Sequence, residues 1–444
     1  MNAGASHENT GKTVSERIVA FAQRSIDDEI RRKASLHLID WMGCAIAGRK
    51  TEAGTIFRAQ EPLGDTPSPT ALAFALGSLG SILEMDDVHR RALLHPGPVV
   101  IPAALSVAPE GAGHRFLDAV ILGYEAMIRL GRSVGAGHYA SFHNTGTCGG
   151  IGSAMAAGHM LDLGEENRAW ALGNAMTLAG GLWQCRNEPV LTKPLHVAEA
   201  TRRGVQAAVL AGHGLTGPKR IFEGPQGFFP AMARDGDAEV IFADAGTGWL
   251  IAETSFKPWP ACRHAHAVID AALALRPTIA GRPIKSIHVL SYADAILFCD
   301  RPTPVTLGEA KFSLQHACAV VFAKGLPELD DFDPAVLHRP DYAGLRALTT
   351  VSAAERFTSA YPAHFGAAVR VTLDNGESFE ATIADALGDT ENPMDEDAIL
   401  DKFHTLAGWA GLDGARRNNL LALARALADD GCPARLRAEL LPHL

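Results

Sequence analysis

Two stretches in the first half of the chain, Ile151–Leu161 and Trp170–Gly180, consist largely of alanine, glycine and apolar residues. Helices with this composition are apolar on more than one face, and a helix that is apolar all round is normally buried. Such a helix must be covered by other helices on several sides. The two stretches therefore predict a layered helical core.

Helix-start signals lie on the N-terminal side of this core. Thr13–Glu16 has the spacing of a capping box, in which a threonine and a glutamate satisfy the first free N–H groups of a helix. Asp27–Glu29 is acidic, as suits the positive end of a helix dipole, and Gly48 is a plausible stop after an apolar face. The first half of the chain is predicted to be helix after helix.

The pattern changes after about Glu253. Ile284–Leu290 is short and β-branched, while Ala368–Leu373 and Phe379–Ile383 alternate between apolar and polar residues around Asn375-Gly376. An Asn-Gly pair between two such runs indicates a β-hairpin. The tail, Met394–Leu444, reads as helical again. We expect a mainly α protein: an all-helical domain formed by residues 13–252 and 392–444, with a smaller α+β domain, residues 253–391, inserted into it.

Composition limits the functions that such a fold can have. The chain has 444 residues, 47% of them hydrophobic and 20% charged, so it can bury a sizeable core. No apolar run approaches the roughly 20 residues of a membrane-spanning helix, and Met1–Lys12 lacks an apolar signal core. We therefore expect a cytoplasmic protein that binds no membrane.

The formal net charge is −10, which disfavours nucleic acid as a partner. A site for an anionic substrate must then be a local cluster of cations inside a cleft. The seven cysteines are odd in number and contain no Cys-x-x-Cys pair. A disulfide framework or a structural zinc site is not expected, and the cysteines are interpreted as small buried apolar residues in a reducing compartment.

The first segment with chemical potential is Glu84–His89, followed by His95. Three carboxylates and two histidines within twelve residues are unusual in a chain this apolar. A metal site is one interpretation, although the spacing of a hard-ion loop is missing. A solvated helix end is the alternative.

The second segment is Ser141–Gly150. Asn144 or Thr145 could cap the helix that follows, and the free N–H groups of that helix could hold a carboxylate. His143 would stand beside them as an acid or base near neutral pH, unless it is a structural histidine. The glycines at 150 and 152 do not follow a convincing strand, so a dinucleotide site is a poor fit.

Three further segments carry cations or histidines. Lys193, in Leu191–His196, is either a surface lysine or a buried one that acts as a base or binds a carboxylate. Phe256–His266 lies where the composition shifts, and boundaries between domains favour clefts. Its His-x-His pair has no partner set that would complete a zinc site. Glu309–His316 is a predicted helix start that carries a histidine.

Taken in order, these segments resemble the MmgE/PrpD family, as do Leu215–Pro218 and Phe222–Phe228. The resemblance extends from Leu36 to the C-terminal helices. The family includes 2-methylcitrate dehydratases, cis-aconitate decarboxylases and an iminodisuccinate epimerase. The resemblance implies a large all-helical domain with an inserted α+β lid, an active site between them, a homodimer, and no metal or organic cofactor.

The resemblance also implies roles for individual residues. The four expected catalytic residues are His143, Lys193, His95 and Lys257. The five expected substrate-binding residues are Glu84, Asp87, Cys262, His266 and His316. Glu84 stands where the decarboxylases have an aspartate.

Three positions depart from the decarboxylase pattern. Val88 replaces a threonine, Cys262 a histidine and His316 a tyrosine. These departures argue against cis-aconitate decarboxylation and favour an epimerase or isomerase of iminodisuccinate type. Such an enzyme removes and returns a proton next to a carboxylate of a small polycarboxylic acid, with lysines stabilising the charge and histidines moving the proton. A lyase such as a 2-methylcitrate-like dehydratase, or a carboxylate-binding protein without activity, remains the alternative.

Overall fold

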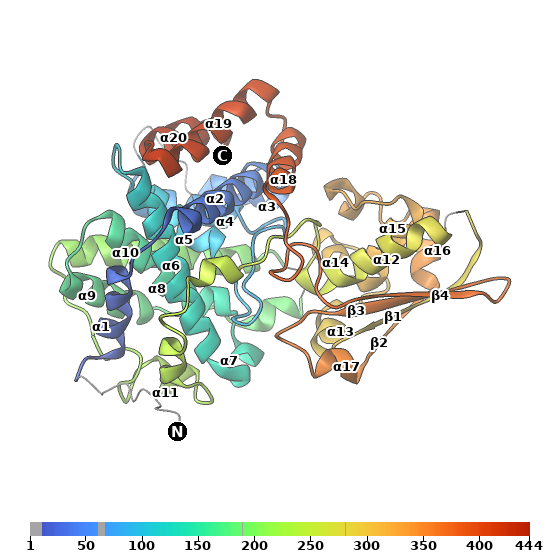
Figure 1. The fold of residues 1–444 in the computed structure, drawn as a ribbon, viewed down its shortest axis with the longest axis horizontal. Helices are drawn as coiled ribbons and strands as arrows, with labels where there is room; N and C mark the ends of the chain where they lie inside the picture. Colours follow the sequence, from blue (N-terminus) through green and yellow to red (C-terminus); the bar gives the residue numbers. More distant parts are fainter. Residues whose placement is uncertain (1–10, 61–66, 189, 280) are drawn as a thin grey trace.

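The computed structural model describes residues 11–60, 67–188, 190–279 and 281–444. Most of the polar N-terminus on which the expected location depends lies outside these residues. Figure 1 shows two lobes of unequal size. The larger, here called the helical lobe, contains the first eleven α-helices and the last three. The smaller, here called the lid lobe, comprises residues 261–386, whose apolar side chains share a core of their own.

The helical lobe is layered around α8 (Asn144–Met160), which packs against α6 (Gly113–Ser133), α9 (Glu165–Met176) and α10 (Lys193–Gly212). Small residues allow this close packing. A Cβ atom built on Gly204 of α10 would lie 2.7 Å from the backbone nitrogen of Ala154 in α8. The predicted layered helical core is therefore confirmed.

The remaining helices of this lobe surround that centre. α1 begins with the predicted capping box of Thr13 and Glu16, and α2 begins at Asp28 with Asp27 as its cap and ends at the predicted Gly48. The bounds are α1 (Val14–Val19), α2 (Asp28–Gly48), α3 (Glu52–Gln60), α4 (Pro69–Leu79), α5 (Gly97–Ser106), α7 (Gly135–Ser141) and α11 (Phe228–Met232).

The lid lobe is built on one four-stranded sheet of order β2-β1-β3-β4. β1 (Ile284–Ser291) pairs in parallel with β2 (Thr349–Ala353) and antiparallel with β3 (Ala367–Leu373), which pairs in turn with β4 (Ser378–Ile383). Gly376 has a φ of 88° between β3 and β4, which confirms the predicted hairpin. The lid helices are α12 (His266–Ile279), α13 (Ala293–Cys299), α14 (Leu307–Lys311), α15 (Leu314–Ala323), α16 (Pro340–Ala347) and α17 (Glu355–Thr358).

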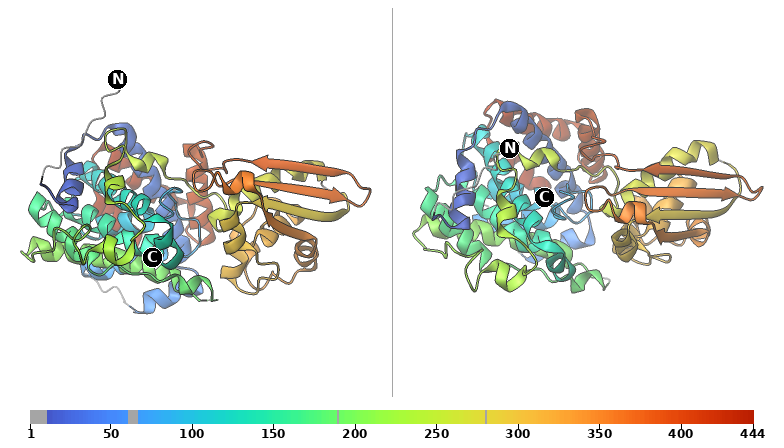
Figure 2. Two further views of the ribbon diagram at one scale, coloured as in Figure 1. Left: turned by 90° about the horizontal axis from the view of Figure 1, so that it is seen from below. Right: turned by 60° about the horizontal axis from the view of Figure 1, so that its bottom comes forward.

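The chain returns to the helical lobe through α18 (Glu396–Trp409), α19 (Gly414–Ala426) and α20 (Pro433–Leu440). α18 packs against α2, and a Cβ atom on Gly43 would lie 3.2 Å from the Cα of Phe403. Both views in Figure 2 place these last helices beside the first ones, within the helical lobe. The lid lobe is thus an insertion between two parts of one helical assembly.

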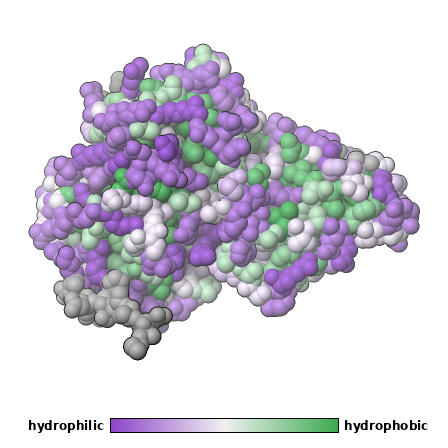
Figure 3. All heavy atoms as spheres, in the orientation of Figure 1, coloured by the Kyte–Doolittle hydropathy of each residue, from purple (hydrophilic) through white to green (hydrophobic). Residues whose placement is uncertain are grey.

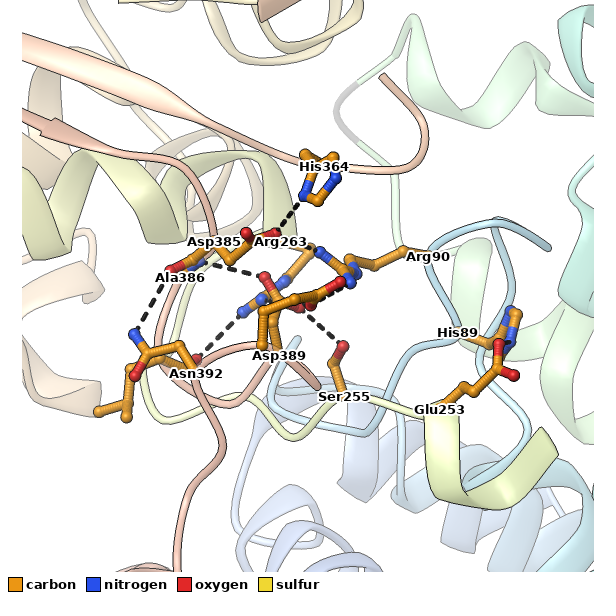
Figure 4. Close-up of polar contacts among 12 residues, drawn as sticks. His89, Arg90, Glu253, Ser255, Arg263, His364, Asp385, Ala386, Asp389 and Asn392 are labelled. Carbon is orange, nitrogen blue, oxygen red and sulfur yellow. Dashed lines mark hydrogen bonds and ion pairs between the residues drawn. The ribbon is translucent and has the colours of Figure 1, made fainter. Parts of the chain in front are cut away.

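A buried ion cluster fastens the two chain segments that connect the lobes (Figure 4). Arg90 of the helical lobe pairs with Asp385 at 2.8 Å and with Asp389 at 3.3 Å, and Arg263 also pairs with Asp389. The hydroxyl of Ser255 donates to Asp389 at 2.7 Å. Because Ser255 lies on the outgoing segment and Asp389 on the returning one, the cluster holds both against the helical lobe.

The face of the molecule shown in Figure 3 is largely hydrophilic over the helical lobe, and apolar residues are more frequent over the lid lobe. Within the described part of the chain, no helix combines the length and apolar character needed to cross a membrane.

Candidate active site

A cavity lies where the two lobes meet, with about 490 Å³ of unfilled space that includes its opening to solvent. Side chains from both lobes line it. The helical lobe contributes Glu84, Val88, Leu93, His95, Tyr139, His143, Trp183 and Lys193, and the lid lobe contributes Cys262, Arg263, His264, Phe298 and Phe365. The structure therefore brings together five of the nine residues predicted for the site, from segments more than 170 positions apart.

His143 occupies the cap position before α8, where its N–H donates to the Gly181 carbonyl at 2.8 Å. The prediction that Asn144 or Thr145 caps this helix is wrong. Their side chains are engaged elsewhere: the Asn144 amide donates to Ala92, and the Thr145 hydroxyl accepts from the N–H of His95. Both bonds hold the loop that carries His95 against the start of α8.

The imidazole of His143 is buried, and one of its two ring nitrogens forms no hydrogen bond with the described residues. Its Nδ1 lies 3.3 Å from Nδ1 of His196, whereas its Nε2 has no hydrogen-bond partner among the described residues. Burial, together with the nearby charges of Lys193 and His196, holds the pKa of His143 well below its ordinary value of 6.5. A neutral imidazole with a free ring nitrogen can exchange a proton with a bound substrate.

Lys193 is the first residue of α10, and its ammonium donates to both oxygens of Glu84, at 2.6 and 2.7 Å. Burial opposes the charge on each partner. The attraction between them outweighs burial. The charge of Lys257 also favours the ionised form of Glu84, and the charge of Asp86 favours the ionised form of Lys193. The pKa of Glu84 is therefore lowered and that of Lys193 raised. The pair is ionised near neutral pH.

Glu84 lies in a left-handed backbone conformation, with a φ of 58°. This region is unfavourable for a residue with a side chain, at a cost of about 1–3 kcal/mol, and it persists only where surrounding contacts enforce it. The strained backbone is therefore a property of the site that the rest of the molecule maintains.

Asp86 forms a second layer behind the cavity. Its carboxylate lies 3.1 Å from Nδ1 of His95 and 3.5 Å from the ammonium of Lys257. Burial again opposes ionisation, but Lys257 and His95 outweigh it and lower the pKa of Asp86. Lys257 is fully buried and does not line the cavity, but its charge acts on the site by pairing with Asp86 and by lowering the pKa of Glu84. The sequence signal for Asp86 was its place in the carboxylate cluster beginning at Glu84.

Three predicted substrate-binding residues lie away from the cavity, which corrects their expected place in the site. Asp87 accepts from the Tyr124 hydroxyl at 2.6 Å and contacts His37, inside the helical lobe. His266 bonds to the Ala261 carbonyl at 3.0 Å, and His316 to the Asp331 carbonyl at 2.9 Å. Each of the three therefore bonds to a protein partner in the interior of its lobe, although Nδ1 of His266 has no partner among the described residues.

Other lining residues were not singled out by the sequence. His264 and Arg263 stand in the predicted Phe256–His266 segment, and Nδ1 of His264 lies 2.5 Å from the hydroxyl of Tyr292. Burial, with help from the charge of Lys193, lowers the pKa of His264 to about 3. The aromatic wall of Tyr139, Trp183, Phe298 and Phe365 has no local sequence signal, because its members come from separate elements.

Cys262 is, beside His264, a lid-lobe residue of the cavity with acid–base capability. Burial raises the pKa of its thiol, but a hydrogen bond from Cys299 and the charge of Lys193 outweigh burial, so the net pKa is lowered. All seven cysteines are free of disulfides. The cavity thus holds proton-exchanging groups from both lobes, among them His143 and Cys262, with a lysine cation beside them.

Within the described ranges, one group of side chains has the geometry of a possible metal site: His364, Asp385 and Glu391, whose ligand atoms lie within 4.8 Å of one another. The guanidinium of Arg90 already pairs with Asp385 and Glu391, so the negative charge that would attract an ion is compensated. The group belongs to the ion cluster between the lobes and does not line the cavity.

The chain belongs to the MmgE/PrpD family. Residues 12–241 match the N-terminal domain of the family and residues 259–427 its C-terminal domain. The chain is 26% identical to a cis-aconitate decarboxylase-like protein oryM from Aspergillus oryzae, over 86% of this chain and 87% of the relative. It is 26% identical to the cis-aconitate decarboxylase of Homo sapiens, over 86% and 84% of the two chains, and 25% identical to that of Aspergillus terreus, over 87% of each.

Proposed function

We propose that this protein is a cofactor-independent enzyme that transfers a proton at the carbon next to a carboxylate of a small polycarboxylic acid. The finer proposal is an epimerase or isomerase of iminodisuccinate type. The observation that carries it is that His143 and Cys262, two groups able to exchange protons, line one cavity from different lobes. Epimerisation requires one group to remove a proton from one face of the carbon and another to return a proton to the opposite face.

The chemical difficulty of this reaction is the charge that develops when the proton leaves. The electron pair left on carbon delocalises into the neighbouring carboxylate, which becomes more negative. The ammonium of Lys193, already held in place by its ion pair with Glu84, stabilises that charge, and the buried Lys257 adds a more distant positive charge. In the proposed reaction the neutral Nε2 of His143 takes the proton and the thiol of Cys262 returns one.

A second candidate is a lyase acting on the same class of substrate, since two of the relatives described above are named cis-aconitate decarboxylases and the third a cis-aconitate decarboxylase-like protein. Decarboxylation needs only one proton donor once carbon dioxide has left. Val88 and Cys262, which stand where decarboxylases carry threonine and histidine, both line the cavity and support the epimerase instead. A carboxylate-binding protein without activity is the third possibility.

Product analysis separates these candidates. The purified protein is incubated with iminodisuccinate, 2-methylcitrate and cis-aconitate in turn. An epimerase inverts one centre without loss of atoms. A dehydratase produces the ultraviolet absorbance of a new enoate, and a decarboxylase releases carbon dioxide. Binding of these acids without any turnover would contradict an enzymatic role.

A homodimer and a cytoplasmic location belong to the same proposal. Several large apolar side chains between positions 178 and 195 are exposed, and burial against a second copy would remove them from water: Leu178, Leu182, Val190, Leu191 and Leu195. The seven free cysteines are consistent with a reducing compartment. A solution mass of twice 47.0 kDa would support the dimer, and a mass equal to one chain would contradict it.

A further inference from the structure

Two buried lysines bind the peptide carbonyls on either side of Glu84. The ammonium of Lys311 donates to the Leu83 carbonyl at 2.7 Å, and that of Lys402 donates to the Met85 carbonyl at 2.6 Å. Both side chains are almost completely buried. Glu84 is the residue with the left-handed backbone, so the strained conformation is held from both sides by charge-assisted hydrogen bonds.

The two lysines come from different lobes. Lys402 lies on α18 of the helical lobe, where it also pairs with Asp40 of α2. Lys311 is the last residue of α14 in the lid lobe, and its own carbonyl accepts from the N–H of Cys262 at 2.9 Å. One lid residue therefore contacts the loop of Glu84 through its side chain and the backbone of Cys262 through its carbonyl.

The ammonium of Lys311 lies among several ionisable groups, and they affect its pKa. The charged or ionisable groups that face it are Glu84, Asp86, Lys257 and Cys44 of α2. Burial lowers the pKa of Lys311 to about 8, with a smaller contribution from Lys257 and opposition from Glu84. Its hydrogen-bonding partner is a neutral carbonyl, and none of the described carboxylates forms an ion pair with it.

We propose that Lys311 is a positioning residue: by binding the Leu83 carbonyl it holds Glu84 against Lys193, and it does so only while the lid lobe is seated on the helical lobe. The ion pair of Glu84 and Lys193 then depends on the contact between the lid lobe and the helical lobe. The effect on turnover rests on the proposed function, whereas the effect on the position of Glu84 does not.

The test compares Lys311→Met, which keeps the length of the side chain but removes the donor, with Lys311→Arg, which keeps a permanent positive charge. Lys285→Met is the matched control, because Lys285 is an exposed lysine of β1 in the same lobe. Crystal structures of the three variants report the Glu84 backbone and its distance from Lys193. Turnover is measured from pH 6 to pH 10 on the acid that the unaltered protein converts.

In Lys311→Met, Glu84 is expected to leave the left-handed region and to separate from Lys193. The value of kcat should fall by about tenfold to a hundredfold, with a smaller change in KM, the usual scale for displacing a group by about an ångström. In the unaltered protein, activity should decline as pH rises through about 8, because Lys311 loses its charge there. In Lys311→Arg this decline should move to higher pH, whereas loss of a merely structural contact would leave the pH profile in place.

Unchanged Glu84 geometry in Lys311→Met would overturn the proposal, even if no acid in the panel is turned over. So would a pH profile of Lys311→Arg identical to that of the unaltered protein. Should Lys311→Met fail to fold, the arginine variant decides: a shifted profile supports the proposal and an unshifted one contradicts it. Lys285→Met should match the unaltered protein in every measurement.

Discussion

At the residue scale, the protonation state of His143 governs the proposed chemistry. Burial and two neighbouring basic groups hold its pKa well below 6.5, so the imidazole remains neutral on the acidic side of neutrality. As a base it is active above its own pKa. As pH is lowered, kcat/KM should therefore begin to fall only well below pH 6.5. A pH–rate profile measures this. An acid limb centred near pH 6.5 would mean that His143 titrates like an exposed histidine, contrary to its burial.

A second prediction at this scale concerns Lys193. In Lys193→Ala the developing negative charge loses its nearest cation, and turnover should fall by at least about a hundredfold, the scale for removing one preorganised stabiliser. Far-ultraviolet circular dichroism should be unchanged, because Lys193 is the first residue of α10 and no helix interior depends on it. Lys219→Ala, a surface lysine paired with Glu166, serves as the control. Near-normal turnover in Lys193→Ala would remove this residue from the mechanism.

Some residues of the site could be predicted and others could not. His143, Lys193 and His95 lie in segments whose order resembles a known family, and the structure places all three around one cavity. Lys311 lies in the segment Glu309–His316, which was singled out for its histidine, and Lys402 lies inside α18; the sequence around neither lysine indicates its partner. Their role comes only from the loop that the two lobes place against them.

At the element scale, predictions succeeded where local chemistry determines the structure. The capping box of Thr13 and the Asn375-Gly376 turn were predicted from their residue types, and both are present. The segment Glu309–His316 was predicted as one helix start, but it spans two helices. The Ser313 side chain accepts from the N–H of His316 and starts α15 anew. Local competition of this kind between caps is hard to resolve from sequence.

The close contact between α8 and α10 gives a stability prediction. In Gly204→Ala the new methyl group would overlap the side chain of Ser153 and the backbone of Ala154, so the free energy of unfolding should fall by about 1–3 kcal/mol. Gly158→Ala is the matched control on α8, because its methyl group would meet nothing closer than 3.5 Å. That variant should be unchanged or slightly more stable, since alanine favours helix. Urea unfolding compares them, and equal stability of the two would contradict the packing described.

At the scale of the whole molecule, the arrangement of the lobes depends on contacts between residues far apart in the chain. Arg90 pairs with carboxylates about 300 positions later, and nothing in the sequence around position 90 indicates those partners. The existence of an inserted α+β region could be predicted from patterns of alternation. The way in which the region is fastened to the helical lobe could not.

The ion cluster therefore carries a prediction of its own. Arg90→Met leaves the buried Asp389 with one cationic partner, Arg263, and leaves Asp385 with His364, so the free energy of unfolding should fall by about 1–3 kcal/mol. Arg339→Met, which removes an exposed pair with Asp341, should cause no measurable change. Thermal and urea unfolding test both variants. Full stability of Arg90→Met would show that the cluster does not hold the lobes together.

The most direct test of two-sided proton transfer is the position of deuterium after a short reaction in heavy water. A substrate of defined configuration at the α carbon is converted to a few per cent, and remaining substrate and product are separated and examined by NMR. If one group removes the proton and another returns a solvent-derived one, the product should carry deuterium at the α carbon while the recovered substrate should not. Product formed without deuterium, or with loss of carbon dioxide or water, would contradict the proposed epimerisation.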